Sequence, residues 1–164
     1  MARRFRGKSL HKVDAKGRVS IPASFRRVLE EGDPDWPAND TPQFVIVYGS
    51  NEGQCLEGYS LKSIDEIDDL IEELPHFSPE REYLETILGT ESEYATVDNS
   101  GRMVLSQALK DKIGLDKEAV FVGKGNRFQI WEPSAYEAEL ARLREWAATQ
   151  DNPKAVLYRR KSEG

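Results

Sequence analysis

The sequence predicts an α+β fold in which two copies of one unit form a small β-barrel with pseudo-twofold symmetry, flanked by helices. The main observation is an internal repeat, because residues 12–29 (KVDAKGRVSIPASFRRVL) align without a gap with residues 96–113 (TVDNSGRMVLSQALKDKI). A second observation is that each copy has the pattern of a strand, a turn, a strand and a helix. Equal units of this kind are expected to bury each other's apolar faces in one core.

Each copy carries the motif Asp-x-x-Gly-Arg where its first strand ends. The carboxylates of Asp14 and Asp98 can accept hydrogen bonds from backbone amides two residues further on, as in Asx-turns. Gly17 and Gly101 supply the positive φ that a tight hairpin or bulge needs. These four residues and Arg102 are therefore predicted to be structural parts of the motif.

The residues after each turn predict a second strand and then a helix. Pro22 stands in the first turn of a helix expected over residues 23–31, and Ser106 can cap its counterpart in the second copy. Further along, β-branched and aromatic residues predict a buried strand over residues 44–48 and a hairpin over residues 120–131.

Helices are predicted to close both copies and to connect them. Apolar residues at helical spacing predict closing helices over residues 61–74 and 133–147. Trp36, in a proline-rich loop, is interpreted as a buried anchor, with a contact between subunits as the alternative. The expected boundaries are residues 8–76 for the first unit, 77–91 for a connecting helix, 92–148 for the second unit, and 1–7 and 149–164 for a basic arm and tail.

Two Asp-x-x-Gly-Arg motifs in register, with their strands and helices, resemble the MraZ family of bacterial transcription regulators over roughly residues 5–147. Phe5-Arg6-Gly7 and Phe128-Gln129-Ile130-Trp131 also fit that family. One unit alone resembles the AbrB-like (SpoVT-AbrB) DNA-binding fold, in which a single unit usually dimerises through swapped hairpins. The resemblance implies a ring-shaped homo-oligomer and a role upstream of a division and cell-wall gene cluster.

The composition argues against a membrane protein and against a disulfide-rich secreted protein. No apolar run reaches 18 residues, and no apolar segment follows the arginine-rich start, so we expect neither a membrane span nor a secretory signal. The single cysteine, Cys55, fits a reducing compartment. We therefore expect a cytoplasmic protein, and the resemblance to DNA-binding regulators implies that it associates with the nucleoid.

The net charge of −6 is unevenly distributed along the chain. Residues 1–27 hold nine Lys or Arg against one acid, whereas residues 62–93 hold eleven acids against two bases. A basic segment that continues into a folded motif is the footprint of a phosphate-binding face, although a solvated arm is the alternative. The predicted DNA-binding residues are Arg3, Arg4, Arg6, Lys8, Lys12, Lys16, Arg18, Arg26 and Arg27.

Arg18 has two interpretations that can coexist. Its guanidinium can contact a phosphate or a guanine edge, or it can form an ion pair with Asp14 across the turn. The second copy retains Asp98 and Arg102 but has Ser100 in place of Lys16. We therefore interpret the acid–arginine pair as partly structural and the surrounding bases of the first copy as functional.

Enzymatic function is not predicted. The chain lacks GxxxxGK, HExxH and CxxC motifs, and its two histidines, His11 and His76, have no third partner for a metal or a catalytic relay. No catalytic residue, cofactor, metal or small-molecule substrate is expected. The predicted function is sequence-specific binding of double-stranded DNA at repeated promoter sites by a homo-oligomer. An adaptor that binds an acidic partner, or an AbrB-like antitoxin, is the alternative.

Overall fold

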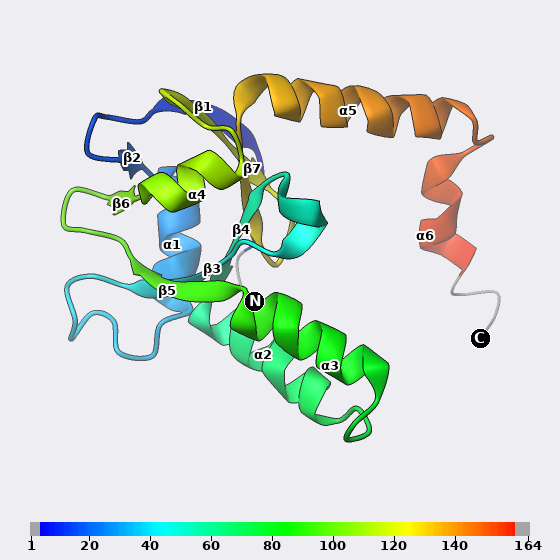
Figure 1. Cartoon of the computed structure of the whole chain (residues 1–164), viewed down its shortest axis with the longest axis horizontal. Coiled ribbons are helices and arrows are strands. Elements are labelled where there is room, and N and C mark those ends of the chain that lie inside the picture. Colours follow the sequence, from blue (N-terminus) through cyan, green and yellow to red (C-terminus); the bar gives the residue numbers. More distant parts are fainter. Residues whose placement is uncertain (1–3, 160–164) are drawn as a thin grey trace. The chain divides into compact units, whose positions relative to one another are not determined.

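The computed structural model describes residues 4–159 and divides the chain into two compact units, Met1–Pro133 and Ser134–Gly164. The first unit contains both turns and all the strands found in the described residues. It combines antiparallel strands with helices, which confirms the predicted α+β class (Figure 1). No helix among the described residues is long and apolar enough to cross a membrane.

Six strands of the first unit form one antiparallel sheet in the order β1-β7-β8-β4-β3-β5. They are β1 (Lys8–Lys12), β3 (Gln43–Val47), β4 (Leu56–Ser60), β5 (Ser92–Thr96), β7 (Glu118–Gly123) and β8 (Phe128–Trp131). The strand after each turn leaves this sheet: β2 (Arg18–Ser20) pairs only with β6 (Arg102–Val104), which places Val19 opposite Met103.

The predicted barrel closure is wrong. In the described residues β1 and β5 are the two edges of the six-stranded sheet, and no ladder joins them. The positive-φ glycines, Gly17 and Gly101, redirect the chain, so β2 and β6 form a separate ribbon instead of extending the main ladder. The core is therefore enclosed by an open sheet and a two-stranded ribbon.

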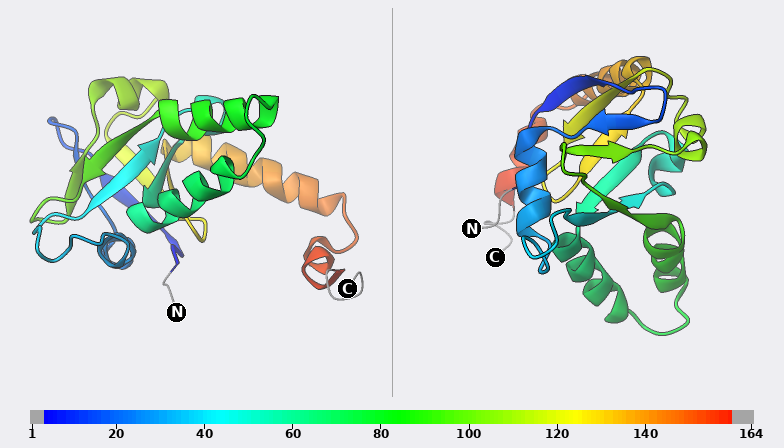
Figure 2. Two further views of the ribbon diagram at one scale, coloured as in Figure 1. Left: turned by 90° about the horizontal axis from the view of Figure 1, so that it is seen from below. Right: turned by 90° about the vertical axis from the view of Figure 1, so that its left-hand side faces the viewer.

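Helices α1 (Ala23–Glu31) and α4 (Gln107–Lys112) follow the ribbon strands, as the repeat predicts. Ser106 caps α4, because its hydroxyl oxygen accepts the backbone N–H of Leu109 at 3.2 Å. Helix α2 (Leu61–Glu72) follows β4, which a short 3-10 turn (Ser50–Gly53) precedes. Helix α3 (Pro79–Glu85) and a π-turn (Thr86–Thr90) then connect α2 to β5. Figure 2 shows α2 and α3 side by side along one edge of the unit.

The two copies share one hydrophobic core. Equivalent positions of the repeat are buried in both copies and belong to the same cluster: Val13 and Val97, Val19 and Met103, Ile21 and Leu105, Phe25 and Leu109, Leu29 and Ile113. Phe128 lies at its centre, with ring centroids 5.2 Å from Phe5 and 5.5 Å from Phe25. Neither copy could bury its apolar positions alone.

Several local expectations can be compared with the structure. The strand at residues 44–48 and the hairpin at 120–131 are confirmed by β3 and by the β7–β8 pairing. Trp36 is 37% exposed, so the buried-anchor interpretation is wrong. Its loop is instead fastened by the buried Asp33, whose carboxylate accepts the backbone N–H groups of Asp35 and Gln43.

The second unit is helical. It contains most of α5 (Pro133–Ala148), as predicted for the second closing helix, followed by a 3-10 turn (Pro153–Ala155) and α6 (Val156–Arg159). The short helical segments lie where the sequence loses its periodicity and predicts only a tail.

Candidate nucleic-acid interface

The two Asp-x-x-Gly-Arg turns have the same backbone geometry. Asp14 Oδ1 accepts the backbone N–H groups of Lys16 and Arg18, both at 2.9 Å. In the second copy, Asp98 Oδ1 accepts those of Ser100 at 2.8 Å and Arg102 at 3.0 Å. The Asx-turns expected from the sequence are therefore present in both copies.

Both turns also depend on glycine. Gly17 has a φ of 83° and Gly101 a φ of 76°, a region that side chains with a Cβ rarely adopt. A Cβ on Gly17 would overlap the carbonyl oxygen of Leu105, and a Cβ on Gly101 would overlap Nη1 of Arg26. The positive φ disfavours larger residues at both positions, and at Gly17 the Leu105 backbone also leaves no room for a Cβ.

The β2–β6 ribbon brings the two turns together. The backbone N–H of Ile21 donates to the carbonyl of Gly101 at 3.0 Å, and that of Leu105 donates to the carbonyl of Gly17 at 2.7 Å. Each glycine is thus bonded to the strand end of the other copy. Both turns project from the same side of the first unit, on the left in Figure 1.

The arginines of the two motifs are held differently. Arg18 Nε donates to Asp14 Oδ2 at 2.6 Å, so the predicted ion pair exists in the first copy. In the second copy, Arg102 Nε lies 3.5 Å from Asp98 Oδ2 without hydrogen-bond geometry. The first guanidinium is fixed by its acid, whereas the second is only near its acid.

Hydrogen bonding also changes the acids of these turns. The backbone N–H of Arg18 is the main cause that lowers the pKa of the Asp14 carboxyl, and the Arg18 side chain adds to it. The backbone N–H of Arg102 lowers the pKa of Asp98 in the same way. Both acids are therefore ionised at neutral pH and can hold an arginine.

The predicted basic residues lie in two groups, one on the first turn and α1 and the other at the opposite end of β1. Lys12, Lys16 and Arg18 lie on or beside the first turn, and Arg26 and Arg27 lie on α1. Lys16, Arg27 and Lys12 are exposed, while Arg18 and Arg26 are half-buried. Lys8 is exposed at the far end of β1.

Arg4 and Arg6 belong with Lys8 at that far end. Phe5 is buried in the core, and it pairs with Gly125 through backbone hydrogen bonds of 2.8 and 3.1 Å. The strand rise of about 3.3 Å per residue puts Gly7 roughly 20 Å from Asp14. Arg3 lies outside the described residues.

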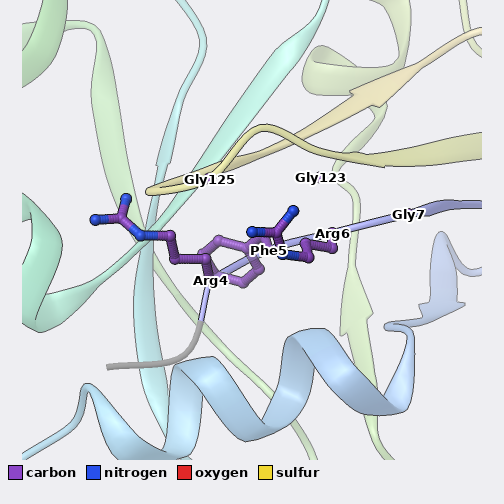
Figure 3. A pocket seen from close by; sticks show the side chains of 6 residues that line it. All are labelled: Arg4, Phe5, Arg6, Gly7, Gly123 and Gly125. Atoms are coloured by element: carbon purple, nitrogen blue, oxygen red, sulfur yellow. The ribbon is translucent and has the colours of Figure 1, made fainter. Parts of the chain in front are cut away.

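A pocket of about 250 Å³ lies beside this arm (Figure 3), lined by Arg4, Phe5, Arg6, Gly7, Gly123 and Gly125. The backbone N–H groups of Gly123 and Gly125 already donate to the carbonyls of Gly7 and Phe5. The pocket therefore offers two exposed guanidinium groups but few open backbone donors, and its structural role is to anchor the arm to the β7–β8 turn.

Sequence reasoning missed a buried polar cluster on β4 and β8. Glu57, only 4% exposed, accepts Arg127 Nε at 2.6 Å and the Gln129 side-chain amide at 3.0 Å. Burial, followed by the charge of Glu57, raises the pKa of Tyr59 well above its ordinary value. Alternation of polar residues on two neighbouring strands was the available signal. No group of three or more potential metal ligands occurs in the part that the structure describes.

Both copies of the repeat are similar to a known protein family. The family model described as "MraZ protein, putative antitoxin-like" matches residues 4–86 and again residues 87–158. The chain belongs to the MraZ family. The two matches follow the internal repeat and cover both units.

Curated relatives in the MraZ family are named "Transcriptional regulator MraZ". The protein of Ruegeria sp. (strain TM1040) is 56% identical over 137 residues, covering 84% of this chain and 82% of the relative. That of Ruegeria pomeroyi is 52% identical over 147 residues, covering 89% and 88%. That of Cereibacter sphaeroides (strain ATCC 17025) is 43% identical over 148 residues, covering 86% and 87%. The family is one of transcriptional regulators, which confirms the prediction of a non-enzyme.

Proposed function

We propose that this member of the MraZ family is a transcriptional regulator that binds double-stranded DNA sequence-specifically through its first turn. The observation that carries the proposal is Arg18, whose guanidinium is fixed by Asp14 at 2.6 Å on a projecting turn. A guanidinium held in one orientation can make a bidentate contact to a guanine edge or a phosphate. The names of the relatives support regulation of transcription.

The bases around Arg18 supply the sequence-independent part of binding. Lys12 and Lys16 are exposed beside it, and Arg27 is exposed on α1. Phosphate contacts position a protein on DNA, whereas base contacts select the sequence. In the second turn the position of Lys16 is taken by Ser100. The first turn is therefore proposed to dominate specific binding.

The fold supports reading the chain as two AbrB-like units with swapped hairpins and pseudo-twofold symmetry. Pairing of β2 with β6 supports the exchange, because each post-turn strand pairs with that of the other copy. The units are proposed to span residues 8–76 and 92–148, joined by a connecting segment at 77–91.

We further propose that the protein acts on repeated promoter sites as a homo-oligomer, at the nucleoid and upstream of its own division and cell-wall gene cluster. A single basic turn offers only a few phosphate contacts, and such contacts alone give non-specific Kd values of about 10⁻⁴–10⁻⁶ M at physiological salt. Several linked subunits would raise the effective affinity. An adaptor that binds an acidic protein partner would use the same basic residues without DNA.

Fluorescence anisotropy with a labelled duplex from the region upstream of the gene tests the DNA proposal. Arg18→Gln is expected to weaken specific binding by about 1–3 kcal/mol and to relax sequence preference. Arg102→Gln is the matched control from the equivalent position and is expected to cost less specificity. Equal losses of sequence preference would contradict the proposed dominance of the first turn in base recognition, and salt-insensitive binding by the wild-type protein would favour the adaptor.

A further inference from the structure

Arg26 reaches from the first copy to the turn of the second. It belongs to α1, yet its guanidinium lies against Gly101, where a Cβ would overlap Nη1 and come within 2.8 Å of Cζ. Gly17, the equivalent glycine, meets the backbone of Leu105 instead. Lys110 occupies the position of Arg26 in the second copy, and the three atoms nearest to a Cβ on Gly17 all belong to the Leu105 backbone. The two turn glycines therefore have different nearest neighbours.

Two guanidinium groups at this second turn have unused donors. Nε of Arg26 and Nε of Arg102 are both buried and have no hydrogen-bond partner among the described residues. By contrast, Nε of Arg18 and Nε of Arg127 each donate to a carboxylate at 2.6 Å. A buried donor without an acceptor is costly, and more so in a charged group. Two of them at one turn indicate that an acceptor from outside the chain completes the site.

The nearby acid does not fill that role. Oδ1 of Asp98 accepts the backbone N–H groups of Ser100 and Arg102. Oδ2 of Asp98 forms an ion pair with Arg102 Nε at 3.5 Å, which is longer than the 2.6 Å between Arg18 Nε and Asp14 Oδ2. Because this contact is long and Arg26 Nε has no partner, a rotation of the two side chains can present them to a ligand. The ligand must be an acceptor with several oxygens, and guanidinium groups match phosphate in this way.

We propose that the second turn is a composite phosphate-binding site in which Arg26 from one copy and Arg102 from the other grip a single phosphate group. The inference rests on the proposed DNA binding, in which that phosphate belongs to the DNA backbone. The two turns then have different tasks: the first, with Arg18 fixed by Asp14, reads bases, and the second anchors the backbone. A Cβ at Gly101 would displace the Arg26 guanidinium from this turn.

A set of single and double substitutions tests the composite site on DNA. Arg26→Met and Arg102→Met should each weaken binding about tenfold, as for the loss of a hydrogen bond to a charged group, and lower the salt slope by about one. If both hold one phosphate, the double variant should lose little more than either single variant, whereas Arg26→Met combined with Arg18→Met should be additive. Lys110→Met, at the position of the second copy equivalent to Arg26, is the matched control and should change binding less than Arg26→Met.

A second measurement needs no DNA. Inorganic phosphate, added at constant ionic strength, should raise the melting temperature of the wild-type protein and of the Lys110→Met variant. The rise should disappear in Arg26→Met, Arg102→Met and Gly101→Ala. Without phosphate, Arg26→Met should unfold no earlier than the wild type, because it removes a donor that has no partner.

These measurements separate failure of the composite site from failure of the proposed function. If the wild-type protein does not bind DNA but phosphate raises its melting temperature through Arg26 and Arg102, the DNA proposal fails and the site stands. If DNA binds but Arg26→Met behaves like Lys110→Met and the phosphate effect persists, the composite site is overturned. A large loss of stability in Arg26→Met without phosphate would likewise assign Arg26 a structural role and overturn the site.

Discussion

At the scale of single residues, two turns with the same motif differ in how their arginines are held. Both carboxylates accept two backbone N–H groups, so the backbone of the turn is equally well satisfied in both copies. Only Asp14 also takes a 2.6 Å hydrogen bond from its arginine side chain. The Asp-x-x-Gly-Arg motif therefore predicts the backbone of the turn. Whether the arginine side chain lies 2.6 Å from the aspartate, as in the first copy, or 3.5 Å from it, as in the second, depends on the surrounding residues.

The lowered pKa values make the two turns a source of pH-dependent stability. Because the folded-state pKa of Asp14 lies below its ordinary value, its contribution is present at neutral pH and is lost as the pH falls through the folded-state pKa. Asp14→Asn keeps the hydrogen-bond acceptor but removes the charge. This variant should be less stable than the wild type at pH 7, and the difference should shrink as the pH falls below about 4.

Urea denaturation at pH 7, 5 and 3.5 measures this difference. Asp98→Asn is the matched comparison and should show a smaller difference at pH 7, because Arg102 Nε lies 3.5 Å from Asp98 Oδ2, whereas Arg18 Nε lies 2.6 Å from Asp14 Oδ2. A difference that stays constant over the whole pH range would show that the charge of Asp14 is not what stabilises the turn.

At the scale of elements, the sequence predicts what depends on local pattern. The Asp-x-x-Gly-Arg turns, the helix at residues 23–31 and the hairpin at 120–131 all follow from turn chemistry and periodicity, and the structure has them. Barrel closure was not predictable in this way, because it depends on whether edges far apart in the sequence meet. The burial of Trp36 was predicted wrongly for the same reason, since the sequence of a loop does not show which distant residues pack against it.

The contact between Arg26 and Gly101 shows a second limit of the repeat. Alignment of the two copies pairs Arg26 with Lys110 and Gly101 with Gly17. It does not show that a side chain of one copy lies on the turn of the other. Such a contact depends on the three-dimensional crossing of β2 and β6, which only the structure supplies.

The buried cluster on β4 and β8 leads to a prediction about the main sheet. Arg127→Ala should destabilise the protein by about 2 kcal/mol, because the buried carboxylate of Glu57 then loses the charged donor of its hydrogen bond. Adding Glu57→Gln should restore part of this loss, because the unpaired charge is then gone. Chemical denaturation of both single variants and the double variant measures the coupling. Additive losses would show that the two groups stabilise the sheet independently.

At the scale of the whole molecule, charge is segregated between the elements. Acids dominate residues 62–93, which include α2 and α3, and bases dominate residues 1–27. Burial, together with the like charges of Asp65, Asp69 and Glu72, raises the pKa of Asp68 on α2. Carboxylates crowded in this way are stabilised when a positive group approaches. The exposed side chains of Leu70, Phe77 and Tyr83, which also lie within residues 62–93, add apolar surface for a contact.

This polarity gives the oligomer prediction a physical basis. The acidic residues within 62–93 of one subunit can approach basic residues of the next subunit. Head-to-tail contacts of this kind close into rings when the rotation between subunits allows it. A ring would present several copies of the first turn to one stretch of DNA. Each later contact then becomes intramolecular, which can raise the overall affinity by roughly 10²–10⁴ without new chemistry.

Two measurements test the oligomer together. Light scattering should give a mass several times that of the 18.6 kDa chain. Shortening the DNA from several repeats to one should reduce the affinity steeply, because the gain from linked contacts is lost, whereas scrambling the bases between repeats at constant length should change it little. Asp65→Lys combined with Asp69→Lys reverses the charge on α2 and should lower the mass if the acidic segment forms the contact. A monomer that binds one repeat as tightly as three would show that each chain recognises DNA alone, and the segregated charge would then serve solubility or another partner.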